Sequence, residues 1–514
     1  MHKLFIKISA VLFFIIAFQG LPVYGNNSIK DSIATLSTDT IPVLPSDTVP
    51  VISPDTIPVT ERYDDKLSIG VLEFITEPAI LLSEYIRIES VTGNEREAGM
   101  FLAQTCKDMG LHVEIFTSDK DTFNFAASLY PLEMNKPNVI LLNHIDVVPA
   151  ENPELWKHPP FSGAIADGYV WGRGAIDMKG MGIMQLMAMQ RFIEEAKNND
   201  FPYNITLLAV SGEETGGHTG AEIVTQRYLD KLNPLVVYNE GGTGLPGVLT
   251  DKNKKLFGIS IATKRTIWLE LTLKMETSGH GSVPPASYSV QEKVEALSRL
   301  IWHNENRYIE FTETTLKMFR ELGKIERGVY GLILRNMRLF RPIAKPVIRR
   351  EEIIYSLASN TISVTGIQTQ PGPPNQIPYE VVSYLDCRLL PEVTTEDFLN
   401  KLRGRLNNPN IKIKVLQEGI MSPTTKIDEN FYKLSDALKN VYQNAEVIPI
   451  LFPASNDNKY FRAKGIPAYG LLPTYMSIEL LETIHSIDER LPVKKLEEGI
   501  DVYTELIKMF LYND

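Results

Sequence analysis

Apolar residues along this chain fall into two kinds of run. Short apolar runs at residues 139–142, 205–210 and 235–238, broken only by Thr206, are typical of strands buried on both faces. Residues 182–197 and 217–229, which follow the first two runs, carry apolar side chains at helical spacing. Strands that alternate with helices in this way predict an α/β domain whose central sheet is mostly parallel.

From residue 265 the pattern changes to that of a second domain. Strands are predicted at 267–275, 360–366, 381–390 and 411–417, and helices at 289–303 and 395–406. This β-α-β-β-α-β order is typical of a ferredoxin-like α+β domain. Because the α/β pattern returns after residue 418, we expect the domain at 265–418 to be inserted into the first domain, formed by 65–264 and 419–514.

Residues 304–358 interrupt this second domain with an amphipathic and basic helical segment. Its cations include Arg335, Arg338, Arg341, Lys345, Arg349 and Arg350. A helix that combines apolar and basic faces can lie on a membrane or cover a binding site. A packed helical insertion with solvated charges is the alternative, and the sequence leaves both interpretations open.

The N-terminus predicts export. Lys3 and Lys7 precede a short apolar run at residues 8–18, so residues 1–25 are expected to be a signal peptide, with an uncleaved membrane anchor as the alternative. Residues 26–64 repeat Asp-Thr-Ile/Val-Pro-Val every eight residues. Regular prolines block helix formation, which predicts a disordered Thr/Pro/Asp-rich tether. We therefore expect a periplasmic or extracellular protein.

Charge and cysteine content limit the classes of partner and of reactive side chain that we expect for this protein. The net charge is −11, which argues against nucleic acid as a partner, because neutralising phosphates needs a basic face. The two cysteines, Cys106 and Cys387, lie far apart and cannot form a disulfide framework. Each is expected to be a small buried apolar residue. Reactive chemistry must therefore come from other side chains.

Histidines and carboxylates follow the predicted buried strands. His144 and Asp146 follow the first, Glu213 and Glu214 the second, and Glu240 the third, while Asp177 lies in a Gly-rich turn and His485 near the C-terminus. In open α/β sheets, ligands bind just beyond the carboxyl ends of the strands. Imidazole and carboxylate oxygens are the ligands of hydrolytic zinc sites. The sequence therefore predicts a metal centre at this edge, with Asp177 placed to bridge two ions.

Three motifs carry a resemblance to a known family. His144–Pro149 reads HxDVVP, Trp171–Gly180 reads W-GRGxxDxKG, and Gly212–Gly217 reads GEExGG. In this order they resemble the motifs of the M20 family of metallopeptidases, over about residues 67–510. The insertion, at residues 336–342, is similar to the carboxypeptidase S and N-acyl amino acid hydrolase branch.

The resemblance implies a dizinc catalytic domain at 65–264 and 419–514 and a lid that can pair two copies at 265–418. The implied metal ligands are His144, Asp177, Glu214, Glu240 and His485, for two Zn²⁺ ions that Co²⁺ or Mn²⁺ could replace. Glu213 would be the general base, Asp146 would orient His144, and His280 would steady an oxyanion. Asn375 and Arg388 would contact substrate. The chain departs from the family at Asn239, where relatives usually carry Asp, and Asp457 is a further candidate pocket residue.

These assignments imply hydrolysis of an amide bond next to a free carboxylate, in a peptide or an N-acyl amino acid. A reversible N-fatty-acyl amino acid hydrolase/synthase is the alternative within the family, since an amphipathic cover could host an acyl chain. A non-catalytic surface binding protein is the alternative from another class. A homodimer formed through the second domain is also expected on this resemblance.

Overall fold

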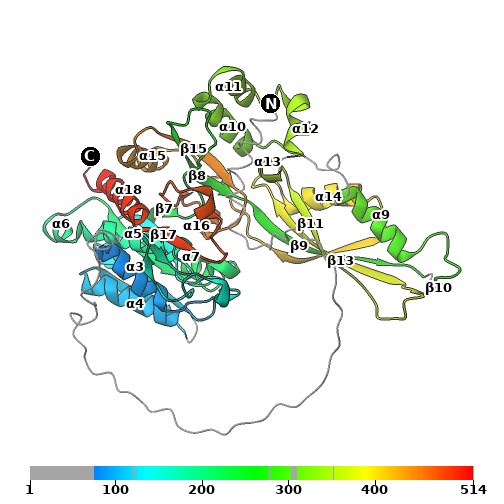
Figure 1. Ribbon diagram of the computed structural model, residues 1–514, viewed down its shortest axis with the longest axis horizontal. Coiled ribbons are helices and arrows are strands. Elements are labelled where there is room, and N and C mark those ends of the chain that lie inside the picture. The colour runs from blue at the N-terminus through cyan, green and yellow to red at the C-terminus, as the bar shows by residue number, and fades with distance from the viewer. Residues whose placement is uncertain (1–74, 120–121, 277–278, 302–308, 351, 513–514) are drawn as a thin grey trace, which may run out of the picture.

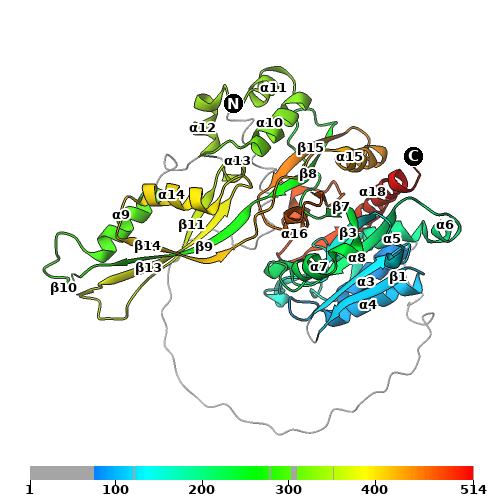
Figure 2. The ribbon, with the colours of Figure 1, turned by 180° about the vertical axis from the view of Figure 1, so that it is seen from behind.

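The computed structural model describes residues 75–119, 122–276, 279–301, 309–350 and 352–512. The predicted signal peptide and the whole of the predicted tether lie outside these residues. One part of the molecule is built on a large sheet flanked by helices, and a second part extends from it as a smaller sheet (Figures 1 and 2). Among the described residues, none of the helices combines the length and apolar character that crossing a bilayer requires.

The large sheet has eight strands in the order β1-β2-β6-β3-β7-β16-β8-β15. The strands are β1 (His112–Ser118), β2 (Phe123–Ser128), β3 (Asn138–His144), β6 (Asn204–Val210), β7 (Pro234–Asn239), β8 (Lys255–Thr263), β15 (Ala445–Phe452) and β16 (Ala468–Gly470). β6, β3, β7 and β16 pair in parallel, as do β8 and β15, whereas β1 and β2 join antiparallel. The prediction of a mostly parallel α/β sheet is confirmed.

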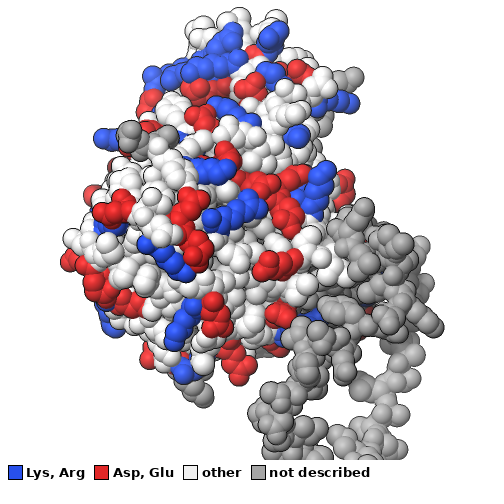
Figure 3. Space-filling view, turned by 90° about the vertical axis from the view of Figure 1, so that its left-hand side faces the viewer, with Lys and Arg blue, Asp and Glu red and all other residues white. Residues whose placement is uncertain are grey.

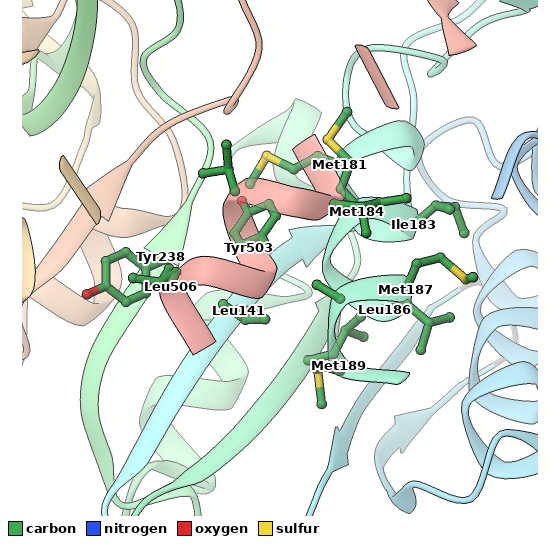
Figure 4. Packing of buried hydrophobic residues seen from close by; sticks show 14 of the residues in the cluster. Leu141, Met181, Ile183, Met184, Leu186, Met187, Met189, Tyr238, Tyr503 and Leu506 are labelled. Carbon is green, nitrogen blue, oxygen red and sulfur yellow. The ribbon is translucent and has the colours of Figure 1, made fainter. Parts of the chain in front are cut away.

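Helices bury both faces of this sheet. One face packs against α3 (Glu77–Arg87), α4 (Arg96–Asp108), α5 (Lys179–Gln190), α15 (Glu429–Val441) and α18 (Val493–Leu511). The other face is covered by α7 (Ala221–Arg227), α8 (Leu229–Leu232) and α16 (Asn458–Ala463). Figure 4 shows the methionines of α5 in one buried cluster with Leu141 of β3 and Tyr503 of α18. Because α5 is buried all round, it fixes the turn that precedes it.

The smaller sheet is antiparallel, in the order β11-β13-β9-β14. Its elements along the chain are β9 (Arg265–Lys274), α9 (Ser289–Ile301), β11 (Thr361–Thr369), β13 (Glu380–Leu389), α14 (Thr395–Leu406) and β14 (Ile411–Glu418). This succession and strand order are those of a ferredoxin-like fold. Two two-residue strands, β10 (Gly279–His280) and β12 (Gln376–Ile377), pair at its outer tip.

The insertion forms four helices: α10 (Glu313–Ile325), α11 (Gly328–Arg335), α12 (Arg341–Ile348) and α13 (Glu352–Leu357). α10 packs against β15 of the large sheet, and its Phe319 is 1% exposed. The same hydrophobic cluster includes residues of both sheets. The insertion is therefore part of the core that joins the two sheets, and removing it whole would expose that core.

Several elements differ from the sequence-based prediction. The helix expected at 182–197 is two helices, α5 and α6 (Ile193–Asn198), because the chain leaves the buried layer at Arg191. The helix expected at 217–229 is divided at Tyr228, whose ring stacks on Phe116. β8 was not predicted, since Gly258 and Ser260 interrupt its apolar run. Both cysteines are buried, as expected.

Candidate metal centre

The candidate ligands converge at the carboxyl edge of the large sheet. His144 ends β3, Glu213 and Glu214 form a turn directly after β6, and Glu240 follows β7. Parallel neighbours in a sheet bring their carboxyl ends together, which places these side chains side by side. The turn before α5 contributes Asp177, and the loop after α17 (Ile478–Leu481) contributes His485 together with one supporting residue, Glu489, described below.

Asp177 lies between the two histidines. Its Oδ1 is 3.2 Å from His144 Nε2, and its Oδ2 is 3.2 Å from His485 Nε2. His485 Nε2 is also 3.1 Å from Glu214 Oε1. A carboxylate that directs one oxygen at each of two imidazoles has the arrangement of a ligand shared by two metal ions.

Two sets of three side chains in this cluster have ligand atoms within 4.8 Å of one another. One set is His144, Asp177 and Glu214, and the other is His144, Glu213 and Glu240. Glu240 therefore lies in the cluster together with His144. Glu213, expected to be the base, also lies close enough to these two residues to serve as a ligand.

The tautomer of His144 fits a metal ligand. Its Nδ1 lies 2.9 Å from the backbone carbonyl oxygen of Asp146. Because a carbonyl only accepts, Nδ1 must donate, and in the neutral ring Nε2 then carries a lone pair. That nitrogen faces Asp177 Oδ1, a second lone-pair atom, at 3.2 Å. A cation between the two atoms satisfies both, and ligating histidines are usually oriented through their other nitrogen in this way.

The electrostatics of the cluster also favour a cation. Burial, and then the nearby Asp177 carboxylate, raise the pKa of Glu240 well above its usual value. Burial and the Glu240 carboxylate raise the pKa of Glu213 in the same way. Although burial alone lowers the pKa of His485, the carboxylates of Glu214 and Asp177 raise it to about 11. Without a cation, these side chains hold protons, and those protons reduce the negative charge of the cluster. A divalent cation would supply this positive charge instead.

Asp146 acts on this cluster differently from the sequence-based expectation. The atom that holds the His144 ring at hydrogen-bond distance is its backbone oxygen, whereas its carboxylate oxygen lies 3.6 Å from the ring. The carboxylate accepts hydrogen bonds from the backbone N–H groups of Glu213 and Glu214, at 3.0 and 3.1 Å, and from the Thr92 hydroxyl at 2.8 Å. Asp146 therefore also fixes the turn that carries the two glutamates.

Glu489 is a supporting residue that the sequence reasoning missed. Its buried carboxylate accepts hydrogen bonds from the backbone N–H groups of Gly174, Ile176 and Asp177, at 2.9 to 3.1 Å. It also pairs with the buried Arg173 guanidinium at 2.7 Å. One side chain thus shapes the whole turn that presents Asp177. Its position four residues after His485 was the available signal.

The loop before α16 supports Glu240. The side-chain amides of Asn456 and Asn458 donate to the Glu240 backbone carbonyl, at 2.8 and 3.2 Å. Between them, Asp457 is buried, and neither of its carboxylate oxygens has a hydrogen-bond partner among the described residues. Burial raises the pKa of Asp457 to about 6. A Cβ at Gly217 would lie 2.1 Å from Asp457 Oδ1, so only glycine fits there.

Asn239 ends β7 directly before Glu240 and is buried. Its side-chain oxygen has no hydrogen-bond partner among the described residues. The backbone carbonyl of Asn239 accepts from the N–H of Leu471 in the neighbouring chain segment. The main chain of Asn239 is therefore hydrogen-bonded at the edge of the sheet, while its side-chain oxygen is a buried acceptor.

His280, predicted to steady an oxyanion, and Asn375 and Arg388, predicted to bind substrate, lie apart from the cluster. His280 Nε2 is 2.8 Å from Asn375 Nδ2, and the two residues line a pocket of about 330 Å³. They belong to the β10–β12 tip, at the opposite end of the molecule from β3 and α5 (Figure 2). Arg388, on β13, forms a two-pronged ion pair with Asp386, at 2.8 and 3.0 Å. The sequence could not predict this separation, because no local pattern specifies how two domains are disposed.

The chain is similar to known protein sequences over most of its length. The family model described as Peptidase family M20/M25/M40 matches residues 140–509. A probable carboxypeptidase S-like 2 from Dictyostelium discoideum is 28% identical over 386 residues, which cover 73% of this chain and 72% of that protein. An N-fatty-acyl-amino acid synthase/hydrolase from Xenopus tropicalis is 25% identical over 442 residues, covering 82% of this chain and 84% of that protein.

Solved structures show the same fold. An M20 family metallo-carboxypeptidase from Sulfolobus solfataricus superimposes with a TM-score of 0.61 at 20% identity, covering 85% of this chain and 100% of that chain. Human carnosine dipeptidase 1 superimposes with a TM-score of 0.56 at 17% identity, covering 87% and 97% respectively. At these identities the likeness bears on the fold alone.

Proposed function

The chain belongs to peptidase family M20/M25/M40, whose members are metal-dependent hydrolases, and from this premise we propose that it hydrolyses an amide bond next to a free carboxylate. The substrates would be peptides cleaved at their C-terminus or N-acyl amino acids. The observation that carries the proposal is the placement of Asp177 between His144 and His485, at 3.2 Å from each ring. The N-terminal apolar segment motivates the further proposal that the protein acts after export.

The donor set suits two Zn²⁺ ions. His144, Asp177 and Glu240 would hold one, and Asp177, Glu214 and His485 the other, with Co²⁺ or Mn²⁺ as substitutes. Bound zinc lowers the pKa of a water molecule and polarises a carbonyl group. The remaining acid, Glu213, would accept the proton of the attacking water and deliver it to the leaving amine. Asp146 would hold the Glu213 backbone in position, through the hydrogen bond described above.

His280 and Asn375 would contact substrate only if the tip that carries them reached a metal centre. Within one copy of the chain this requires the smaller sheet to close towards the larger one. A homodimer formed through the smaller sheet would bring the tip to the centre of a second copy. The hydrogen bond between His280 and Asn375 supports a joint role, since it holds the two side chains together.

Hydrolysis and synthesis of N-fatty-acyl amino acids is a second candidate function. It is supported by the likeness to relatives described as N-fatty-acyl-amino acid synthase/hydrolases, from Xenopus tropicalis and mouse among others. The two candidates share the metal centre and differ in the group on the acyl side of the scissile bond.

A matched substrate panel tests the proposal. The purified full chain is incubated with a blocked dipeptide, a short N-acyl amino acid and a long-chain N-acyl amino acid, and free amino acid is measured. Each compound is also supplied with its carboxylate converted to an amide. We expect release from the acids and at least ~10²-fold slower release from the amides. A site built to bind a carboxylate contains a buried polar partner for it, and a neutral amide leaves that partner unpaired.

The panel also separates the alternatives. Preference for the long-chain compound would select the fatty-acyl candidate, and preference for the dipeptide would select the carboxypeptidase. Equal release from acids and amides would contradict recognition of a free carboxylate.

A further inference from the structure

Helices α11 and α12, with the turns that flank them, present an outward surface that is both apolar and basic. We name it the α11–α12 surface and define it by two sets of residues. Its apolar members are Val329, Leu332, Leu339 and Ile343. Its cations are Arg327, Arg335, Arg338, Arg341, Lys345, Arg349 and Arg350. Neither set takes part in the metal centre.

The apolar members are held outwards by helix geometry. On α12, Ala344 and Ile348 are four residues apart and are buried, at 2% and 0% exposure. Ile343 of the same helix lies on a different face and is 52% exposed, and Leu339, in the turn directly before α12, is 76% exposed. Side chains three or four apart share a helix face, so the repeat of α12 that buries Ala344 and Ile348 turns Ile343 outwards. Val329 and Leu332 are exposed on α11 in the same way, at 70% and 49%.

The helices beneath this surface are closely packed. A Cβ at Gly331 of α11 would lie 2.0 Å from the Glu326 backbone oxygen and 2.8 Å from that of Gly323 on α10. Leu334 and Met337 are buried in the core on the inner side, each 1% exposed. The exposed apolar side chains therefore stand on a firm support, and their exposure does not result from a poorly packed segment.

The charge of this segment is opposite to that of the whole protein. Residues 327–350 contain the seven cations named above and no aspartate or glutamate, whereas the complete chain has a net charge of −11. Figure 3 shows Lys and Arg side chains gathered at the upper end of the molecule, where Figure 1 places α10, α11 and α12.

Among the described residues, several nearby acids pair with groups outside this surface. Glu313 pairs with Arg338. Glu321 instead pairs with Lys324 of its own helix, and Glu310 with Lys401 of α14. The carboxylate of Glu326 accepts from the Thr250 backbone N–H at 2.7 Å. Glu351 and Glu352 follow Arg350 directly, so residues 327–352 combine seven cations with two acids and keep a positive net charge.

We propose that the α11–α12 surface docks onto an anionic phospholipid bilayer. The cations would lie at the level of the lipid headgroups, and the four exposed aliphatic side chains would enter the boundary with the acyl chains. Basic amphipathic helices bind membranes through this combination of charge and apolar area. A nucleic acid would engage the cations alone and would gain nothing from exposed Leu339 and Ile343, so a bilayer fits the whole surface better.

Vesicle sedimentation tests this proposal with the full chain. Vesicles are made of phosphatidylcholine alone, or of phosphatidylcholine and phosphatidylglycerol in equal parts. We expect binding to the mixed vesicles that weakens with added salt, and at least ~10-fold weaker binding to phosphatidylcholine, because each basic residue near an anionic surface contributes roughly fivefold to binding. Since every variant keeps the same N-terminal segment, differences between variants report on the α11–α12 surface.

Two variants separate the two parts of the surface. Leu339→Ser with Ile343→Ser removes apolar area, and Arg341→Gln with Arg350→Gln removes charge. Each is expected to weaken binding to the mixed vesicles about tenfold. The matched controls are Ile115→Ser on β1, where the isoleucine is 53% exposed, and Lys439→Gln with Lys508→Gln on α15 and α18. The controls should bind as the unaltered protein does.

Several results would overturn the proposal. One is binding to both vesicle types with equal affinity, and another is a loss of binding in the controls as large as in the variants. Binding to a DNA duplex but not to vesicles would assign the surface to nucleic acid instead. Thermal unfolding of each variant, expected to match the unaltered protein, shows that any loss of binding arises at the surface.

Discussion

Replacing Glu213 by Gln is expected to reduce amide hydrolysis by about 10³-fold, because a glutamine cannot accept the proton of the attacking water and general acid–base catalysis contributes typically 10² to 10⁴. The substitution keeps the size of the side chain and its backbone hydrogen bond to Asp146. The effect should fall on kcat rather than on KM, since the lost interaction belongs to the reaction step. Initial rates across a range of substrate concentrations measure both constants.

The metal content of this variant decides the role of Glu213. The Glu213 carboxylate lies close enough to His144 and Glu240 to bind a metal ion together with them. If Glu213 is the base, elemental analysis should find the same metal content as in the unaltered protein. A loss of metal in parallel with activity would make Glu213 a ligand instead. Glu194→Gln, at an exposed side chain paired with Lys197, is the matched control and should keep full activity.

Replacing Glu489 by Gln is expected to lower the free energy of unfolding by roughly 3–5 kcal/mol, the usual cost of breaking a buried ion pair by removing one partner. Arg173 and Glu489 are 2% and 0% exposed, so water cannot replace the lost charge. An amide also places an N–H₂ group where a carboxylate accepts from three backbone N–H groups. Asp177 should shift as a result, with a fall in metal affinity.

Urea unfolding of the metal-free proteins measures this cost, because it separates the ion pair from any stabilisation by bound metal. The matched control is Asp167→Asn, which breaks the exposed pair of Asp167 with Lys157. Exposed pairs contribute about 0–1 kcal/mol, so the control should unfold almost as the unaltered protein does. Equal stability of Glu489→Gln and the control would contradict the role assigned to Glu489.

Much of the fold, and the meeting of several candidate site residues at one edge of the large sheet, could be predicted from the sequence. His144, Glu213 and Glu240 each follow an apolar run, and a parallel sheet aligns the ends of such runs by construction. The strand–helix succession of the smaller sheet could also be predicted, because strict alternation and helical spacing are local properties of the sequence.

The supporting residues could not be predicted in the same way. Glu489 acts on a turn more than 300 residues away, as the separation from Arg173 shows, and no local pattern records such a contact. Asp146 holds His144 through a backbone oxygen, which every residue carries. β8 could not be predicted because Gly258 interrupts its apolar run. A Cβ at Gly258 would lie 2.9 Å from Ile450, so a glycine allows the close packing found there.

The most direct test of the central claim is removal and return of the metal. The full chain is stripped with a chelator, dialysed, and assayed for free amino acid release from the preferred substrate before and after Zn²⁺ is added. We expect the stripped protein to be inactive and Zn²⁺ to restore release, with about two ions bound per chain if Asp177 is shared as proposed. Undiminished release by protein shown to be free of metal would contradict the account.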